Sequence, residues 1–316
     1  MATHDPCRFA ALRGHDALRD FLQQTASQDR LAHALLFAGA EGIGKRTFAL
    51  AFAAWLQCTQ RGADSCGECA SCRQVAAGSH PDVKLTGIPE KKKEIGVDRA
   101  REIKRFTQLR PASAPQKVVI IDSAHCLNVA AQNALLKTLE DPPLRSILIL
   151  VASNPDALLA TVRSRCQRIN FQPLPVEVVQ TILEQSHGLG SDTARELAAV
   201  SEGSPGRALE LQRYLGNGQT APAVLFDGMA DARYVDLAKR IASLAQPEDS
   251  LQARLEILLA QVRDEAAAAA KRGDTVTAAS WLRRAAVIHE AADIVHRRSP
   301  NRQLLLDSLT LRLTRA

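Results

Sequence analysis

Residues 34–46 determine the architecture of this chain, and they read Ala34-Leu35-Leu36-Phe37-Ala38-Gly39-Ala40-Glu41-Gly42-Ile43-Gly44-Lys45-Arg46. The apolar run at 34–38 predicts a buried strand, and the glycines predict a turn that opens a helix over 44–56. A phosphate-binding loop requires this context, because its backbone N–H groups curl around phosphate oxygens and its lysine reaches the outer phosphates. The alternative for the loop alone is an ordinary tight turn. The candidate nucleotide-binding residues here are Gly39, Gly42, Gly44 and Lys45.

The loop departs from the pattern of an active ATPase. The position after the lysine is normally Ser or Thr, whose hydroxyl binds Mg²⁺, but here it is Arg46. A second apolar run, 118–121, ends in Asp122, and the Glu that would activate water is replaced by Ser123. We therefore expect no Mg²⁺ site and little or no ATP hydrolysis by the chain itself, and ATP or ADP binding stays an open alternative.

The first half of the chain alternates apolar runs with helical patterns. Such alternation predicts an α/β fold, with a parallel sheet and helices on both faces. The expected strands are 34–38, 83–85, 118–121, 147–151 and 169–171. The expected helices are 44–56, 98–109 (with its N-cap at Asp98) and 128–140.

Strand patterns end near Pro173 and Pro175, and the remainder is predicted to be helical. The expected helices are 176–185, 193–202, 206–215, 235–244, 251–271, 276–296 and 302–312. We divide the chain into a nucleotide-binding domain at 1–173, a small helical domain at 174–215 and an all-helical domain at 216–316.

Four cysteines have the spacing of a metal site: Cys58, Cys66, Cys69 and Cys72. Thiolates bind Zn²⁺ tetrahedrally, and four ligands leave no open position, so we predict a structural zinc site within 58–72. The alternatives are an iron–sulfur cluster, which tight cysteine runs also hold, and disulfides, which are rare in the cytoplasm. The cysteines interpreted as ordinary small residues are Cys7, Cys126 and Cys166.

Two arginines follow the run at 147–151, and the second lies in the triplet Ser164-Arg165-Cys166. Most such pairs are solvated surface charges. Together with the loop and the cysteines, however, the triplet resembles the clamp-loader branch of the AAA+ ATPases. The residues that carry the resemblance are Leu31-Ala32-His33-Ala34, the loop, the four cysteines, 118–122, Asn133-Ala134-Leu135-Leu136-Lys137-Thr138-Leu139-Glu140 and the triplet.

The resemblance covers nearly the whole chain. It implies a AAA+ P-loop domain with a zinc-binding insert, a helical lid at 174–215, and a helical collar at 216–316 that joins five subunits in a ring. It also implies that Arg165 is an arginine finger, acting in trans on the ATP of a neighbouring subunit. Asn154 and Arg207 occupy the positions of the two nucleotide sensors and would be relics here. The implied partners are the ATPase motor and delta subunits of the loader, the sliding clamp and primed DNA, all serving DNA replication.

We therefore predict a non-hydrolysing clamp-loader subunit without enzyme activity of its own. One alternative is the ATP-hydrolysing motor subunit, which Ser or Thr at position 46 and Glu at position 123 would have favoured. Another is a zinc-dependent nucleic-acid-binding module. No aromatic residues interleave with basic ones near the cysteines, and single-strand binding needs such stacking platforms.

Composition limits the class of protein. The chain has 316 residues, 46% of them hydrophobic, which excludes a largely disordered chain. A net charge of +6 permits contact with nucleic acid without demonstrating it. We interpret the basic excess in 250–316 as a solvated helix face, with a DNA-contacting face as the alternative. No apolar run approaches the ~20 residues of a membrane helix, and 1–20 lacks a signal pattern, so we expect a cytoplasmic location.

Overall fold

The computed structural model describes residues 7–90, 92–143, 145–215, 251–297 and 302–313. The expected helix at 235–244 lies outside these residues. The chain divides into two compact units, Met1–Ala198 with Glu202–Gly206, and Ala199–Ser201 with Arg207–Ala316. The boundary between them falls inside 174–215, and the division into three domains stays a prediction.

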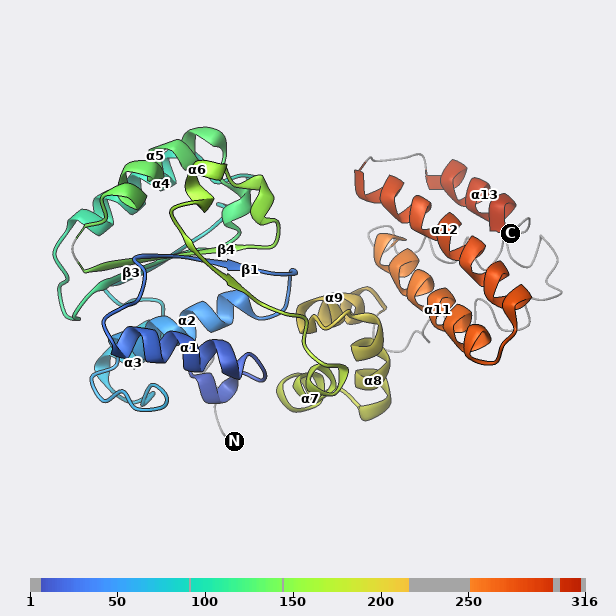
Figure 1. The fold of residues 1–316 in the computed structure, drawn as a ribbon, viewed down its shortest axis with the longest axis horizontal. Helices are drawn as coiled ribbons and strands as arrows, with labels where there is room; N and C mark the ends of the chain where they lie inside the picture. Colours follow the sequence, from blue (N-terminus) through green and yellow to red (C-terminus); the bar gives the residue numbers. More distant parts are fainter. Residues whose placement is uncertain (1–6, 91, 144, 216–250, 298–301, 314–316) are drawn as a thin grey trace. The chain divides into compact units, whose positions relative to one another are not determined.

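The first unit is built on a five-stranded parallel sheet with the strand order β2-β3-β4-β1-β5 (Figure 1). Its strands are β1 (Ala34–Ala38), β2 (Val83–Thr86), β3 (Lys117–Ile121), β4 (Ser146–Ala152) and β5 (Gln167–Asn170). All residues of β1, β3 and β4 are buried, as strands covered on both faces should be. The five expected strands are confirmed, with ends shifted by no more than two residues.

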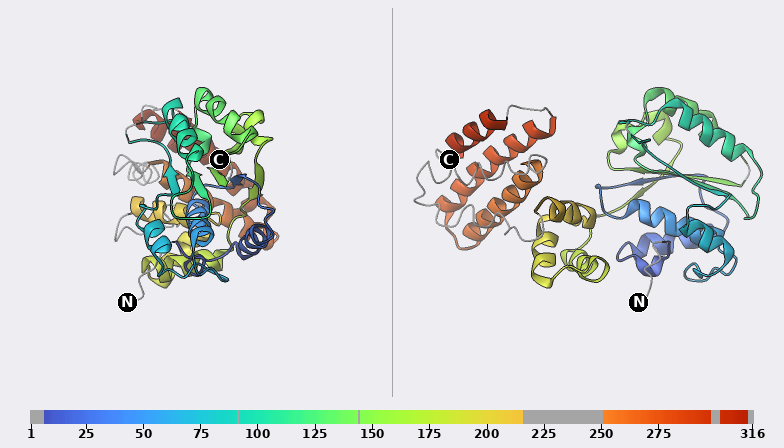
Figure 2. Two further views of the ribbon diagram at one scale, coloured as in Figure 1. Left: turned by 90° about the vertical axis from the view of Figure 1, so that its left-hand side faces the viewer. Right: turned by 180° about the vertical axis from the view of Figure 1, so that it is seen from behind.

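Helices cover both faces of this sheet (Figures 1 and 2). One face packs against α1 (Asp16–Ser27) and α2 (Lys45–Gln57), and α3 (Ala70–Ala76) lies beside α2. The other face packs against α4 (Val97–Gln108), α5 (Val129–Glu140) and α6 (Ala160–Arg163).

The predicted N-cap of α4 is wrong. The helix begins one residue before Asp98, because Gly96 is extended and its carbonyl accepts the first helical hydrogen bond, from the N–H of Arg99. Asp98 lies instead in the first turn of α4. There its negative charge is favoured by the helix dipole.

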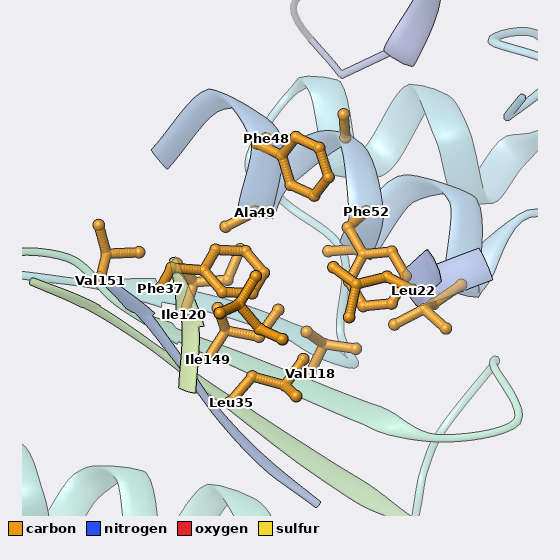
Figure 3. Packing of buried hydrophobic residues seen from close by; sticks show 14 of the residues in the cluster. Leu22, Leu35, Phe37, Phe48, Ala49, Phe52, Val118, Ile120, Ile149 and Val151 are labelled. Atoms are coloured by element: carbon orange, nitrogen blue, oxygen red, sulfur yellow. The ribbon is translucent and has the colours of Figure 1, made fainter. Parts of the chain in front are cut away.

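The core between α2 and the sheet is rich in phenylalanine (Figure 3). Phe48 of α2 lies edge-on to Phe37 of β1, with 5.8 Å between ring centroids. Phe52, one turn further along α2, lies with Leu22 of α1 above Val118 of β3 (Figure 3). These contacts fix the start of α2, and therefore the loop that precedes it, against β1.

Two further helices, α7 (Val176–His187) and α8 (Ser191–Val200), follow the sheet, and all but the last two residues of α8 belong to the first unit. The sequence predicts that the helix over 193–202 ends at residue 202, but the corresponding helix α8 ends at Val200. Glu202 and Gly203 have φ angles of 52° and 77°, and left-handed backbone of this kind ends a helix. The next helix, α9 (Pro205–Leu215), begins with a proline, which suits a first helical position.

The second unit contains α11 (Leu251–Lys271), α12 (Thr275–Arg297) and α13 (Arg302–Leu313). These three expected helices are confirmed to within one residue at each end. Their shared core is mainly leucine, with Leu255, Leu258, Ile288 and Leu309 almost fully buried. Within the described residues, no helix is both long enough and apolar enough to cross a membrane.

A buried ion pair fixes the amino end of the sheet. Asp82, which is fully buried just before β2, accepts hydrogen bonds from the backbone N–H groups of 112–114 and from Lys117 Nζ at 3.1 Å. Lys117 Nζ also lies 4.1 Å from the ring centroid of Phe106 in α4. Burial alone would raise the pKa of Asp82, but the hydrogen bonds outweigh it and lower the pKa to about 2.

We expect Asp82→Asn to lower the free energy of unfolding by about 3–5 kcal/mol at pH 7, because Lys117 keeps a buried charge without its counter-charge. Urea unfolding of the full chain measures this. The pKa of Asp82 is lower in the folded than in the unfolded chain. Its contribution is therefore complete above about pH 4 and is lost as the pH falls toward 2, so the difference between variant and parent should shrink over that interval.

Glu102→Gln is the matched control, because Glu102 pairs with Arg99 and Lys84 at the surface. Exposed pairs contribute less than about 1 kcal/mol. An Asp82→Asn loss no larger than that of the control would contradict the prediction.

Candidate functional site

Three of the predicted site segments meet at the carboxyl end of the sheet. The loop follows β1, Asp122 follows β3, and Asn154 follows β4, which lies between β1 and β3. Ligands of open α/β sheets bind at this end of the strands. Asn154 is exposed, while its neighbour Ser153 bonds His125 through its hydroxyl at 3.2 Å.

The loop is curled around its own lysine. Lys45 is the first residue of α2 and only 5% exposed, and its ammonium group donates to the carbonyl oxygens of Gly39 at 2.7 Å and Ala40 at 2.5 Å. Burial lowers the pKa of Lys45. Gly39 cannot be replaced without strain, because a Cβ there would lie 2.6 Å from the carbonyl oxygen of Phe171. At Gly44, which has a φ of 95°, an added Cβ would meet no heavy atom within 4 Å, so this side of the loop is open.

The acidic group at this end of the sheet already has a cation beside it. Asp122 Oδ2 lies 3.5 Å from the guanidinium Nη1 of Arg46, and its Oδ1 accepts a 3.0 Å hydrogen bond from the backbone N–H of Ser123. Mg²⁺ would need oxygen ligands here, and Arg46 brings a positive charge in place of the usual hydroxyl. These residues do not fit a magnesium ion.

A segment far along the chain packs on the outside of the loop. The N–H of Gly206 donates to Gly42 O at 2.9 Å, and the Ser204 hydroxyl donates to Glu41 O at 2.7 Å. From α1, His15 Nε2 bonds Ile43 O at 3.0 Å. Protein donors therefore satisfy three consecutive carbonyls of the loop, so its outer side is fixed by the fold.

The remaining predicted nucleotide-binding residue, Arg207, belongs to the second unit. There its guanidinium pairs with Glu256 of α11 at 3.2 Å. Its role as a sensor relic stays a prediction.

The four predicted metal ligands lie together. The sulfur atoms of Cys58, Cys66, Cys69 and Cys72 are all within 4.8 Å of one another. The Sγ atoms of Cys66 and Cys72 are 3.9 Å apart, close to the ~3.8 Å between thiolates 2.3 Å from one tetrahedral zinc ion. All seven cysteines lie among the described residues, and none of them forms a disulfide.

Local hydrogen bonds reach three of these sulfur atoms, while burial raises the pKa of the Cys58 and Cys72 thiols. The backbone N–H groups of Cys66, Cys69 and Cys72 point at the sulfur of the preceding cysteine of the set, at 3.3–3.4 Å. Burial opposes ionisation of Cys69, but the bonds from the Cys72 N–H and from Thr59 lower the pKa of its thiol to about 6. The donor set and its geometry fit a four-thiolate metal site.

The cysteine segment also holds the start of the chain. Asp64 accepts hydrogen bonds from the backbone N–H of Phe9 at 3.0 Å and of Ala10 at 2.9 Å, and it lies 3.7 Å from Arg8 Nε. The turn Phe9–Ala11 is therefore fixed to the segment that carries the four sulfur atoms.

Arg165 lies at the opposite, amino end of the sheet. It precedes β5, whose first residue Gln167 pairs with Leu35 near the start of β1, so most of the length of β1 separates it from the loop. Four strand residues span about 13 Å. Its side chain is 35% exposed, and Nη2 lies 2.7 Å from Glu140 Oε1. Burial raises the pKa of the adjacent Cys166 to about 11, which does not suit a nucleophile.

Sequence reasoning missed several groups at these sites: His15, Ser204, Gly206 and Glu140. The bond from Ser204 to Glu41 joins residues 163 positions apart, and no local spacing signals such a contact. Glu140 and Arg165 both lie in segments that carry the family resemblance, 133–140 and 164–166. Their spacing in the sequence does not show that the two side chains form an ion pair.

The fold and the loop define the class: a parallel α/β protein with a glycine-rich loop between β1 and α2, in which Arg46 follows the lysine. The family described as DNA polymerase III, delta subunit, matches residues 14–175, just over half of the 316 residues, and the chain belongs to this family.

Individual proteins show the same relationship. A DNA polymerase III subunit delta′ from Pseudomonas aeruginosa is 38% identical over 200 residues, which is 62% of this chain and 59% of that protein. A DNA polymerase III subunit tau from Bacillus subtilis is 37% identical over 175 residues, 55% of this chain and 31% of its own. The chain thus spans about three fifths of the delta′ relative and a smaller part of the tau relative. A solved DNA polymerase III gamma subunit-related protein from Thermotoga maritima covers 95% of this chain and 98% of its own at 17% identity, with a TM-score of 0.46. That likeness is too loose to support an argument.

We expect Gly206→Ala to disturb the loop. A Cβ at residue 206 would lie 2.6 Å from Gly42 Cα, and backbone cannot yield as a flexible side chain does. Overpacking of this kind costs about 1–3 kcal/mol, so the urea midpoint of the first unit should fall and amide exchange in the loop should speed up.

The matched control is Gly190→Ala, immediately before α8 in the first unit, where an added Cβ meets no heavy atom within 4 Å. Equal behaviour of the two variants would show that 204–206 does not hold the loop.

Proposed function

We propose that this chain is a delta′-type clamp-loader subunit. It would help a ring of related subunits open a sliding clamp and place it on primed DNA during replication. Membership of the DNA polymerase III delta family and the likeness to delta′ and tau subunits support this proposal. Its proposed partners are the ATPase motor and delta subunits of the loader, and through them the clamp and DNA.

One observation carries the functional assignment: the groups for hydrolysis and for trans activation lie at opposite ends of one sheet. At the carboxyl end, Arg46 takes the place of the magnesium-binding hydroxyl and pairs with Asp122. At the amino end, Arg165 is partly exposed and separated from its own loop. The chain would thus not hydrolyse ATP. Arg165 would instead supply positive charge to the transferring phosphoryl group of a neighbour's ATP.

The tau relative favours one alternative, a hydrolysing subunit of the same complex. Arg46 and Ser123 argue against it, since a guanidinium cannot coordinate Mg²⁺ and Ser123 lacks the carboxylate that would activate water. Steady-state phosphate release by the purified chain, at a rate typical of such ATPases, would establish the alternative and overturn the proposal.

The test of the trans role is Arg165→Ala in the reconstituted loader. Hydrolysis at the neighbouring site should fall by a factor on the order of 10³, because the developing charge on the phosphoryl group loses its cation. ATP turnover is measured with clamp and primed DNA, and gel filtration confirms that the ring assembles.

Arg163→Ala is the matched control, since Arg163 pairs with Asp156 on the same short segment. It should leave turnover unchanged. If Arg165→Ala leaves turnover at the parent level in an intact ring, Arg165 is not the finger.

We propose further that the four cysteines hold a structural zinc ion. The clustering of their four sulfur atoms within 4.8 Å of one another and the N–H groups directed at three of them support this assignment. When bound, the ion would stabilise the segment 58–72, and through Asp64 the turn Phe9–Ala11. We assign it no part in chemistry, because four thiolates leave no position open.

The purified chain should be colourless and carry one equivalent of zinc by elemental analysis. Cys69→Ser should lose the metal and expose the start of the chain to protease, whereas Cys126→Ser, outside the cluster, should do neither. A brown protein absorbing near ~400 nm would point to an iron–sulfur cluster instead.

A further inference from the structure

We propose that Glu140 is a positioning residue for Arg165: its carboxylate orients the guanidinium toward the neighbouring subunit. The inference rests on the proposed finger role of Arg165 and adds to it a second residue on which the rate depends. Glu140 does not touch the phosphoryl group in this scheme. It acts only through the arginine.

The contacts hold the guanidinium at both terminal nitrogens. Nη2 lies 2.7 Å from Glu140 Oε1, and Nη1 donates to the Thr161 carbonyl at 2.9 Å, with the Ser164 hydroxyl at 3.4 Å. Thr161 and Ser164 belong to the same short segment as Arg165, whereas Glu140 comes from α5. Glu140 therefore ties the tip of Arg165 to a second, separate element of the sheet domain.

Arg165 still has free N–H donors for a ligand while Glu140, Thr161 and Ser164 hold its guanidinium. A guanidinium carries five N–H groups in a planar fork, and these contacts use at most three of them. An arginine side chain loses about 2 kcal/mol of rotamer entropy when it is fixed. Holding it in advance removes part of that cost from the step in which it meets the phosphoryl group.

The position of Glu140 supports a role beyond surface charge. It is the last residue of α5, where the helix dipole disfavours a carboxylate, and Asp141 beside it adds a second negative charge. A glutamate is unfavourable there unless a cation compensates it. Arg165 provides that cation, while the nearby Arg163 is paired separately with Asp156.

The experiment uses the reconstituted loader with clamp, primed DNA and ATP. Glu140→Ala should lower the kcat of the Arg165-dependent site by about 10-fold, since a misplacement of about 1 Å is enough for losses of this size or larger. The KM for ATP should not change, because Glu140 does not contact the nucleotide. Glu140→Gln, which keeps an oxygen acceptor at the same reach, should recover most of the rate.

Non-additivity separates positioning from other effects. If Glu140 acts only through Arg165, the double variant Glu140→Ala with Arg165→Ala should be no slower than Arg165→Ala alone. Asp156→Asn, which breaks the neighbouring ion pair of Arg163, is the matched control and should leave kcat unchanged.

The outcomes distinguish this inference from the function on which it rests. If Arg165→Ala has no effect, the finger itself is wrong. If Arg165→Ala slows turnover but Glu140→Ala leaves it unchanged or raises it, only the positioning role is wrong. A glutamine variant as slow as the alanine variant, or a double variant slower than Arg165→Ala alone, would also overturn it.

Discussion

A parallel sheet that is covered by helices on both faces can present chemistry only at the two ends of its strands. β1, β3 and β4 are buried throughout. The direction of the strands therefore separates the polar groups around the sheet. The glycine-rich loop and Asp122 lie at the carboxyl end, while Arg165, Glu140 and the Asp82–Lys117 pair lie at the amino end.

The polar groups of the loop find their partners within the protein. Lys45 is buried, and a buried charge without a partner is costly. Lys45 binds carbonyls of its own loop, Arg46 binds Asp122, and Ser204 and Gly206 bind the loop from outside. Phe171 leaves no room for a side chain at Gly39, and Gly42 leaves none at Gly206.

The sequence predicts what is local or periodic. Apolar runs located all five strands, and the cysteine cluster was predictable because its four ligands lie within 58–72. The sequence patterns did not indicate α1. They favoured Asp98 as the N-cap of α4, because the actual N-cap, Gly96, has no side chain that could accept a capping hydrogen bond. The pairs of Arg46 with Asp122, Glu140 with Arg165 and Asp82 with Lys117 depend on which elements the fold brings together. The spacing of residues in the sequence does not indicate which elements become neighbours in the fold.

The place of β1 in the sheet has a consequence for how the chain is made. β1 is the first strand to be synthesised, yet Ala34 pairs with Leu148 of β4, more than 100 residues later, and its other neighbour β5 is later still. During synthesis this apolar strand stays without both neighbours until the sheet is nearly complete. Pairing over such sequence distances is slow and leaves hydrophobic surface exposed in the meantime. The apolar residues 34–38 are therefore open to aggregation until most of the sheet has been synthesised.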